Sequence, residues 1–221
     1  MGKNDEGFSY TNRVAAAWKR EARRPPFWVE LAVTLIAFVI FLLVNLHFSD
    51  YVEARPGVEL PDPILRLFSP VDVTWYVFAV LWFSTVLGMA CLAPEPECIL
   101  MVIQAFTLHN AFRVATLFLT PLEAPPGTIP LTDPLVELTA TGETLTKDLF
   151  FSGHAAAMFL LFLSAKKRWL KPVFLMSTLV VSLLVVLQYV HYVVDVLVAP
   201  FMAYGSWRII VLCHERFDPQ P

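Results

Sequence analysis

Residues 172–207 read PVFLMSTLVVSLLVVLQYVHYVVDVLVAPFMAYGSW, and this stretch decides the fold class. Asp195 is its single charged residue. As one helix the stretch would be about 54 Å long at about 1.5 Å per residue, whereas about 20 residues cross a bilayer core of about 30 Å. We therefore expect a break near Gln188–His191 and two membrane-spanning helices.

Four further segments have the length and apolarity of membrane spans. They are Leu31–Ser49, Val73–Pro94 and Leu149–Ala165, which carry no charge, and Cys98–Leu119, which carries one, Arg113. The chain is 57% hydrophobic and 16% charged, and soluble domains have roughly 25% charged residues. The sequence therefore predicts an all-α integral membrane bundle of six transmembrane helices rather than a soluble protein.

The distribution of basic residues favours a cytoplasmic location for both chain termini, because Lys and Arg concentrate on that side of a membrane. Most lie in the N-terminal segment or between the fourth and fifth spans: Lys3, Arg13, Lys19, Arg20, Arg23, Arg24, Lys166, Lys167, Arg168 and Lys171. We expect a basic cytoplasmic segment over residues 1–26, the six-span catalytic membrane domain over 27–213 and a cytoplasmic tail over 214–221. The formal charge of -3 gives no sign of a nucleic-acid partner.

A few ionisable side chains lie inside or beside the predicted spans. Such groups cost about 2.5 to 3.5 kcal/mol each at the bilayer centre, so a chain that keeps them usually uses them. Arg113 follows His109 by four residues and Asp195 follows His191 by four, which on a helix places each pair on one face. A carboxylate at Asp195 can hold one nitrogen of the His191 ring as N–H and leave the other free as a nucleophile.

The predicted topology brings His154, His191 and Arg113 to one depth near the outer ends of three spans. Helix N-termini offer free N–H groups, and a glycine lets an anion approach the backbone, so a phosphate group fits this site. The catalytic candidates are His154, His191 and Asp195. The candidates for substrate or phosphate binding are Arg113, Asp148, Ser152, Gly153 and Tyr192. Asp148 can either orient His154 or cap the fourth span, and His109 is interpreted as a packing residue.

Two motifs near the C-terminus are FSGH at residues 151–154 and HYVVDV at residues 191–196. They resemble the C-terminal signatures of the sphingomyelin synthase family, a branch of the type 2 phosphatidic-acid phosphatase superfamily. Upstream positions fit the other motifs of this family in the same order: Leu60-Pro61-Asp62, then Arg113, Thr116, Thr120 and Leu122, then Asp148. The resemblance covers about residues 59 to 200 and implies a six-span architecture.

The resemblance also implies a mechanism. His191 would attack the phosphorus of a phospholipid donor, Asp195 would orient it, and His154 would protonate the leaving diacylglycerol. His154 would then act as a base toward a lipid alcohol such as ceramide or diacylglycerol, which takes the head group from the phosphohistidine. This reaction uses no cofactor or metal, and the active site would lie on the exoplasmic side, lumenal or periplasmic.

The chain departs from the family pattern at Thr146 and Lys147, where the family has Cys-Gly, and at Glu123, where it has Pro. It also lacks the Arg that phosphatases of the superfamily carry shortly before the nucleophilic His, which favours the synthase branch. The head group and the acceptor stay open, as does a covering role for the loop 120–147. Also open are a lipid phosphate phosphatase with water as acceptor, a metal hydrolase with ligands His154, His191 and Asp195, and a non-enzymatic multi-span scaffold or transporter.

Overall fold

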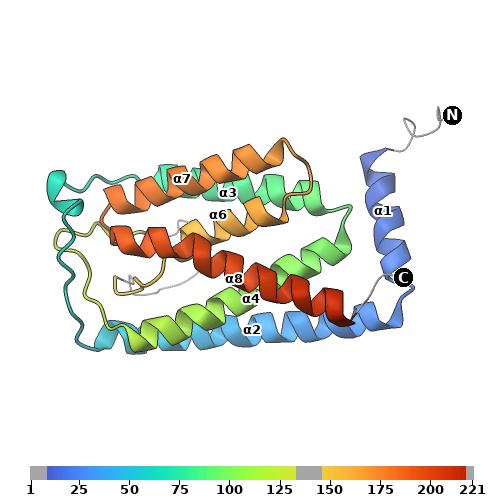
Figure 1. The fold of residues 1–221 in the computed structure, drawn as a ribbon, viewed down its shortest axis with the longest axis horizontal. Helices are drawn as coiled ribbons and strands as arrows, with labels where there is room; N and C mark the ends of the chain where they lie inside the picture. Colours follow the sequence, from blue (N-terminus) through green and yellow to red (C-terminus); the bar gives the residue numbers. More distant parts are fainter. Residues whose placement is uncertain (1–8, 133–145, 218–221) are drawn as a thin grey trace.

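The computed structural model of the chain describes residues 9–132 and 146–217, and these residues form seven α-helices (Figure 1). The helices are α1 (Tyr10–Glu21), α2 (Pro25–Ala54), α3 (Thr74–Leu92), α4 (Pro96–Leu119), α6 (Gly153–Ser164), α7 (Leu170–Leu187) and α8 (Val193–Phe217). A short 3-10 helix, η1 (Leu65–Leu67), lies between α2 and α3. The β-structure found in these two ranges is one isolated bridge between Val58 and Leu122. The predicted all-α class is confirmed.

Five of these helices are long and apolar enough to cross a membrane: α2, α3, α4, α7 and α8. They suggest an integral membrane protein. Helix α6 has 12 residues and is therefore about 18 Å long, less than a bilayer core of about 30 Å. The predicted helix over Leu149–Ala165 was wrong at its start, because Ser152 is the N-cap of α6 and residues 149–152 are not helical.

The other predicted spans correspond to helices with shifted ends. Helix α2 is longer than the predicted Leu31–Ser49 because Pro25 and Pro26 occupy its first turn, where proline lacks only an N–H that has no partner in the helix. Helix α4 likewise begins at a proline, Pro96. Residue 27, the predicted start of the membrane domain, lies inside the first turn of α2.

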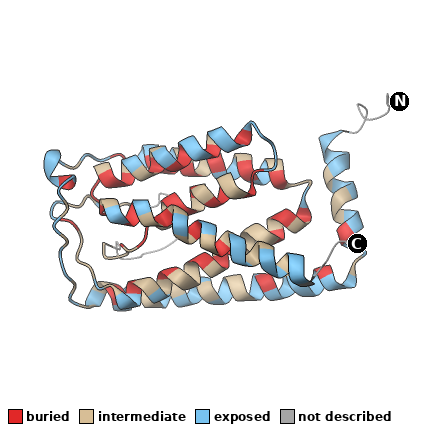
Figure 2. Ribbon diagram, in the orientation of Figure 1, coloured by how far each residue is buried: buried red, intermediate tan, exposed pale blue. Residues whose placement is uncertain are grey.

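The short helix α6 lies at the centre of the bundle and packs against α3, α4, α7 and α8. Ala155 and Ala156 are fully buried, and small side chains of this kind let neighbouring helices approach closely. Helix α2 lies at the periphery, packs mainly on α4 and exposes most of its apolar side chains (Figure 2). The residues at the start of α6 are thus enclosed by other helices, whereas α2 has the surface expected of a lipid-facing helix.

The predicted break in residues 172–207 is confirmed, since α7 ends at Leu187 and α8 begins at Val193. Gln188 is buried in this turn, where its side-chain oxygen accepts the backbone N–H of Val73 at 3.0 Å. Tyr189 has a φ of 62°, a left-handed conformation that is uncommon for a residue other than glycine. These two residues reverse the chain and attach the turn to the start of α3.

The loops that carry the motifs gather at one end of the bundle, at the left in Figure 1. Backbone hydrogen bonds join them there: Val58 N–H to the carbonyl of Pro121, Val71 N–H to that of Leu187, and Ile129 N–H to that of Gln188. At the opposite end α1 lies across the bundle (Figure 1), and its Trp18 ring N–H donates to the carbonyl of Ala93 at 2.9 Å. The candidate site therefore lies at the end of the bundle far from α1.

Candidate active site

The first pair of predicted catalytic residues, His191 and Asp195, is in contact. The Nδ1 atom of His191 lies 3.4 Å from Oδ2 of Asp195, and both residues are buried. The expectation that both lie on one helix was wrong, because α8 begins at Val193 and His191 lies in the preceding turn. Asp195 Oδ2 also accepts the Tyr192 N–H at 3.0 Å. The carboxylate therefore holds the turn of residues 191 and 192 against the first turn of α8.

Two neighbouring segments fix the first turn of α8. A carboxylate oxygen of Asp62 accepts the N–H of Val193 at 2.9 Å, which satisfies one of the free N–H groups at the helix start. Ser152 donates its N–H to the carbonyl oxygen of Asp195 at 3.2 Å. Asp62 belongs to the predicted Leu-Pro-Asp motif, and its contact gives that motif a structural role.

His154 is the second residue of α6, and its ring contacts that of His191, which lies in the turn before α8. The centroids of the two rings are 6.5 Å apart, with an angle of 63° between their planes. The Nδ1 atom of His154 is buried and has no hydrogen-bond partner within residues 9–132 and 146–217. The structure thus brings together the two imidazoles that the sequence singled out.

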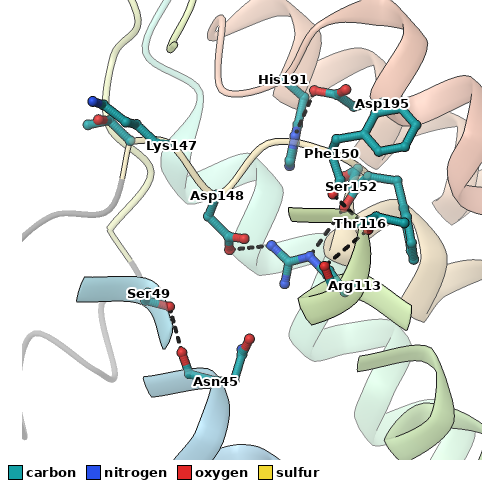
Figure 3. Close-up of polar contacts among 12 residues, drawn as sticks. Asn45, Ser49, Arg113, Thr116, Lys147, Asp148, Phe150, Ser152, His191 and Asp195 are labelled. Atoms are coloured by element: carbon teal, nitrogen blue, oxygen red, sulfur yellow. Dashed lines mark hydrogen bonds and ion pairs between the residues drawn. The ribbon is translucent and has the colours of Figure 1, made fainter. Parts of the chain in front are cut away.

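Arg113 reaches the start of α6 from α4. Its Nε donates to the carbonyl of Phe151 at 3.2 Å, and a terminal nitrogen forms an ion pair with Asp148 (Figure 3). A Cβ added to Gly153 would lie 2.9 Å from Nη1 of Arg113. Gly153 was expected to let an anion approach the backbone. In the structure, the group nearest to the position of its absent Cβ is the Arg113 guanidinium.

Asp148 lies in the segment before α6 with its side chain turned toward Arg113 (Figure 3). Burial acts to raise the pKa of the Asp148 carboxyl, but the Arg113 guanidinium outweighs it and holds that pKa below its ordinary value of 3.8. The N-cap alternative for Asp148 was wrong, because the Ser152 hydroxyl accepts the Ala155 N–H at 3.4 Å and caps α6. An orienting role toward His154 stays a prediction.

Two further predicted residues occupy positions that the sequence could not specify. Tyr192 is buried, and its hydroxyl accepts the N–H of Leu60 at 3.2 Å and donates to the carbonyl of Glu123 at 2.9 Å. It therefore joins the loop that contains Leu60 to the loop that contains Glu123. His109 lies on the same face of α4 as Arg113, is buried, and packs edge-on against the Phe151 ring at 4.9 Å between centroids. This contact fits the packing role that was predicted for His109.

Two of the residues that depart from the family pattern, Lys147 and Glu123, contact each other, and the sequence did not predict this contact. The ammonium of Lys147 lies 3.0 Å from Oε1 of Glu123. The hydrogen bond from Lys147, followed by that from the Gly57 N–H, lowers the pKa of Glu123 below its ordinary value. The N–H of Glu123 donates to the carbonyl of Val58 at 3.1 Å, a bond that proline in this position could not make.

A close approach of the backbone explains one glycine in the same loops. A Cβ at Gly57 would lie 2.5 Å from the carbonyl carbon of Leu122. Because backbone atoms cannot move aside as easily as a side chain, a larger residue would push the two loops apart. The bridge between Val58 and Leu122 therefore depends on the glycine that precedes it.

In the part of the chain that the structure describes, no group of three or more His, Cys, Asp or Glu side chains is arranged to hold a metal ion. One carboxylate oxygen of Asp195 contacts His191.

Residues 147–212 match the family model described as PAP2 superfamily C-terminal. The matched residues include Asp148, His154, His191 and Asp195, whereas Arg113 lies before them. A comparison with curated proteins found no match. The family match suggests an activity of the lipid phosphatase or phosphotransferase type.

Proposed function

We propose that the chain is an integral membrane lipid phosphotransferase. It would move a phospho-head group from a phospholipid donor to a lipid alcohol, ceramide or diacylglycerol, through a phosphohistidine. The observation that carries this proposal is the pair of imidazoles from α6 and from the turn before α8, with ring centroids 6.5 Å apart. One of them, His191, contacts Asp195. The PAP2 match over residues 147–212 supports the same class of chemistry.

In the first step, Nε2 of His191 attacks the phosphorus of the donor. Asp195 holds the Nδ1 proton, which leaves the Nε2 lone pair free. The bond from phosphorus to the diacylglycerol oxygen breaks, and His154 gives its proton to that oxygen. The products are free diacylglycerol and a head group bound through phosphorus to His191.

In the second step, neutral His154 takes the proton from the acceptor hydroxyl, whose oxygen attacks the phosphorus. The bond from phosphorus to Nε2 of His191 breaks, and both imidazoles return to their starting states. Arg113 and the free N–H groups at the start of α6 stabilise the charge on the phosphoryl oxygens in both steps. Imidazole suits this chemistry because it is both a nucleophile and a leaving group.

We further propose that six helices cross the membrane, with both termini in the cytoplasm and the site on the exoplasmic side. Helix α6 and its flanking residues would form the fourth crossing, because the chain passes through α6 from the end with the motif loops to the end where α7 begins (Figure 1). The basic residues near α1 and between α6 and α7 support this orientation.

A phosphatase that uses water as acceptor is the second candidate, because the PAP2 match fits hydrolases as well as transferases. The two reactions share the first step and differ in what removes the head group from His191. Water would give a free phospho-head group, and a lipid alcohol would give a new phospholipid or sphingolipid.

The test is reconstitution in vesicles that contain head-group-labelled phospholipid, with and without ceramide or diacylglycerol. We expect wild type to form a new labelled lipid only when an acceptor lipid is present, and His191→Ala to form none. The matched control is His47→Ala, a change of an exposed histidine on α2, which should act like wild type. Release of free phospho-head group in place of a new lipid would support the phosphatase, and unchanged conversion by His191→Ala would refute both candidates.

A further inference from the structure

Glu53 is a carboxylate at the outer end of α2 that no motif of the sequence includes. Its Oε2 accepts the backbone N–H groups of Thr146 and Lys147, each at 3.0 Å. Its other oxygen accepts the hydroxyl of Thr146. One side chain therefore satisfies three donors of the segment that leads directly into Asp148.

Lys147 is held on its other side as well. Its ammonium donates to Oε1 of Glu123 at 3.0 Å and to the backbone carbonyl of Arg55 at 2.9 Å. The backbone and the side chain of Lys147 are thus both attached to residues at or beside the end of α2. This leaves the residue before Asp148 little freedom to move.

The end of α2 is also attached to the helix that carries Arg113. The Arg55 guanidinium donates to the carbonyl of Phe118, in the last turn of α4, at 2.9 Å. The two halves of the ion pair between Arg113 and Asp148 are therefore both positioned from the same point. Glu53 lies before residues 147–212, the part that matches the PAP2 family, so the peripheral helix α2 contributes to a site built by the other helices.

We infer that Glu53 is a positioning residue of the active site. By accepting the N–H groups of Thr146 and Lys147, it holds Asp148 against Arg113 and thereby sets where the guanidinium meets the phosphoryl group. This inference rests on the proposed function, because it assigns Glu53 an effect on phosphoryl transfer through Arg113. The need is for an acceptor oxygen rather than for charge, since one carbonyl oxygen has two lone pairs and can accept both N–H groups.

The test compares Glu53→Ala and Glu53→Gln with wild type and with Asp50→Ala, an exposed carboxylate on the same helix. We expect Glu53→Ala to lower kcat about tenfold with a smaller change in KM, because a small displacement of a charged group that acts in the transition state weakens catalysis. Glu53→Gln and Asp50→Ala should stay within about twofold of wild type. Equal losses in the Gln and Ala variants, or wild-type kcat in the Ala variant, would overturn the inference.

A second measurement separates positioning from general stability. If Glu53 acts through Asp148, Glu53→Ala should lower kcat no further when it is added to Asp148→Asn. A further tenfold loss in the double variant would contradict the positioning role.

Hydrogen exchange gives a readout that needs no activity. The amides of residues 146 and 147 should exchange faster in Glu53→Ala than in wild type and at nearly the wild-type rate in Glu53→Gln. Unchanged exchange in Glu53→Ala would refute the inference. Absence of lipid conversion in the wild type, with the expected exchange pattern intact, would count against the proposed function alone.

Discussion

Replacement of Gly153 by alanine tests the geometry at the start of α6. The added Cβ would lie 2.9 Å from Nη1 of Arg113 and 3.1 Å from its Cζ, whereas ordinary contact begins at 3.4 Å. The guanidinium must therefore move by about 0.5 Å, the difference between 3.4 and 2.9 Å. Its bonds to the Phe151 carbonyl and to Asp148 leave little room for this movement.

We expect Gly153→Ala to lower kcat/KM about 10- to 100-fold, since a misplacement of about 1 Å at a catalytic group costs about 100-fold. The fold should change little, because the three atoms nearest to the added Cβ all belong to the flexible side chain of Arg113. Head-group transfer in vesicles and thermal unfolding in detergent measure the two effects. The pairing of lower activity with unchanged or higher stability distinguishes displacement of Arg113 from general damage.

The matched control is Gly205→Ala in α8, because a Cβ there meets nothing within 4 Å. Its activity should equal that of wild type. Wild-type activity of Gly153→Ala, or an equal loss in both variants, would refute the argument that the Arg113 position limits the reaction.

Other predictions address the charges of the site. Asp195→Asn should lower kcat about 1,000-fold or more with the fold intact, because the amide no longer selects the His191 tautomer with Nδ1 protonated; a loss below tenfold would contradict this role. Arg113→Lys should lower kcat/KM about 100-fold, since an ammonium cannot reproduce the planar contacts of a guanidinium, and a wild-type value would show that a positive charge alone suffices. The pKa of Asp148 lies below 3.8, so its stabilising ion pair should persist at neutral pH and fade below about pH 4. The difference in Tm between wild type and Asp148→Asn should shrink over that acid range, and a constant difference would remove the ion pair as its cause. Transfer should continue in excess chelator, and its loss would favour a metal site.

The apolar patterning was sufficient to predict the helices and the break between α7 and α8. Long apolar segments have few alternatives to a helix in lipid, and the 36 residues from 172 to 207 are too many for one span of a bilayer. The patterning could not show that the helical part of Leu149–Ala165 begins at Gly153. Residues 149–152 are as apolar as the helix that follows them. That helix begins only at Gly153, because Ser152 caps it and the Phe151 carbonyl accepts a hydrogen bond from Arg113.

The sequence named candidate site residues but did not predict the contacts between them. The spacing of His191 and Asp195 predicted their pairing for a helical reason that the structure does not support, because a turn brings the two side chains together. Asp148 had no local pattern that named Arg113 as its partner, since the two residues are 35 positions apart in the sequence. Glu53 had no signal at all, because its contacts to backbone N–H groups depend on where a distant segment passes.

In the proposed reaction, His191 carries the head group between the donor lipid and the acceptor lipid. The direct measurement is rapid quenching of the reconstituted protein with head-group-labelled phospholipid, followed by mass spectrometry of its peptides. We expect a label on His191 in the wild type, more of it in the absence of acceptor lipid, and none in His191→Ala. Turnover with no label on His191, or with the label on another residue, would contradict it.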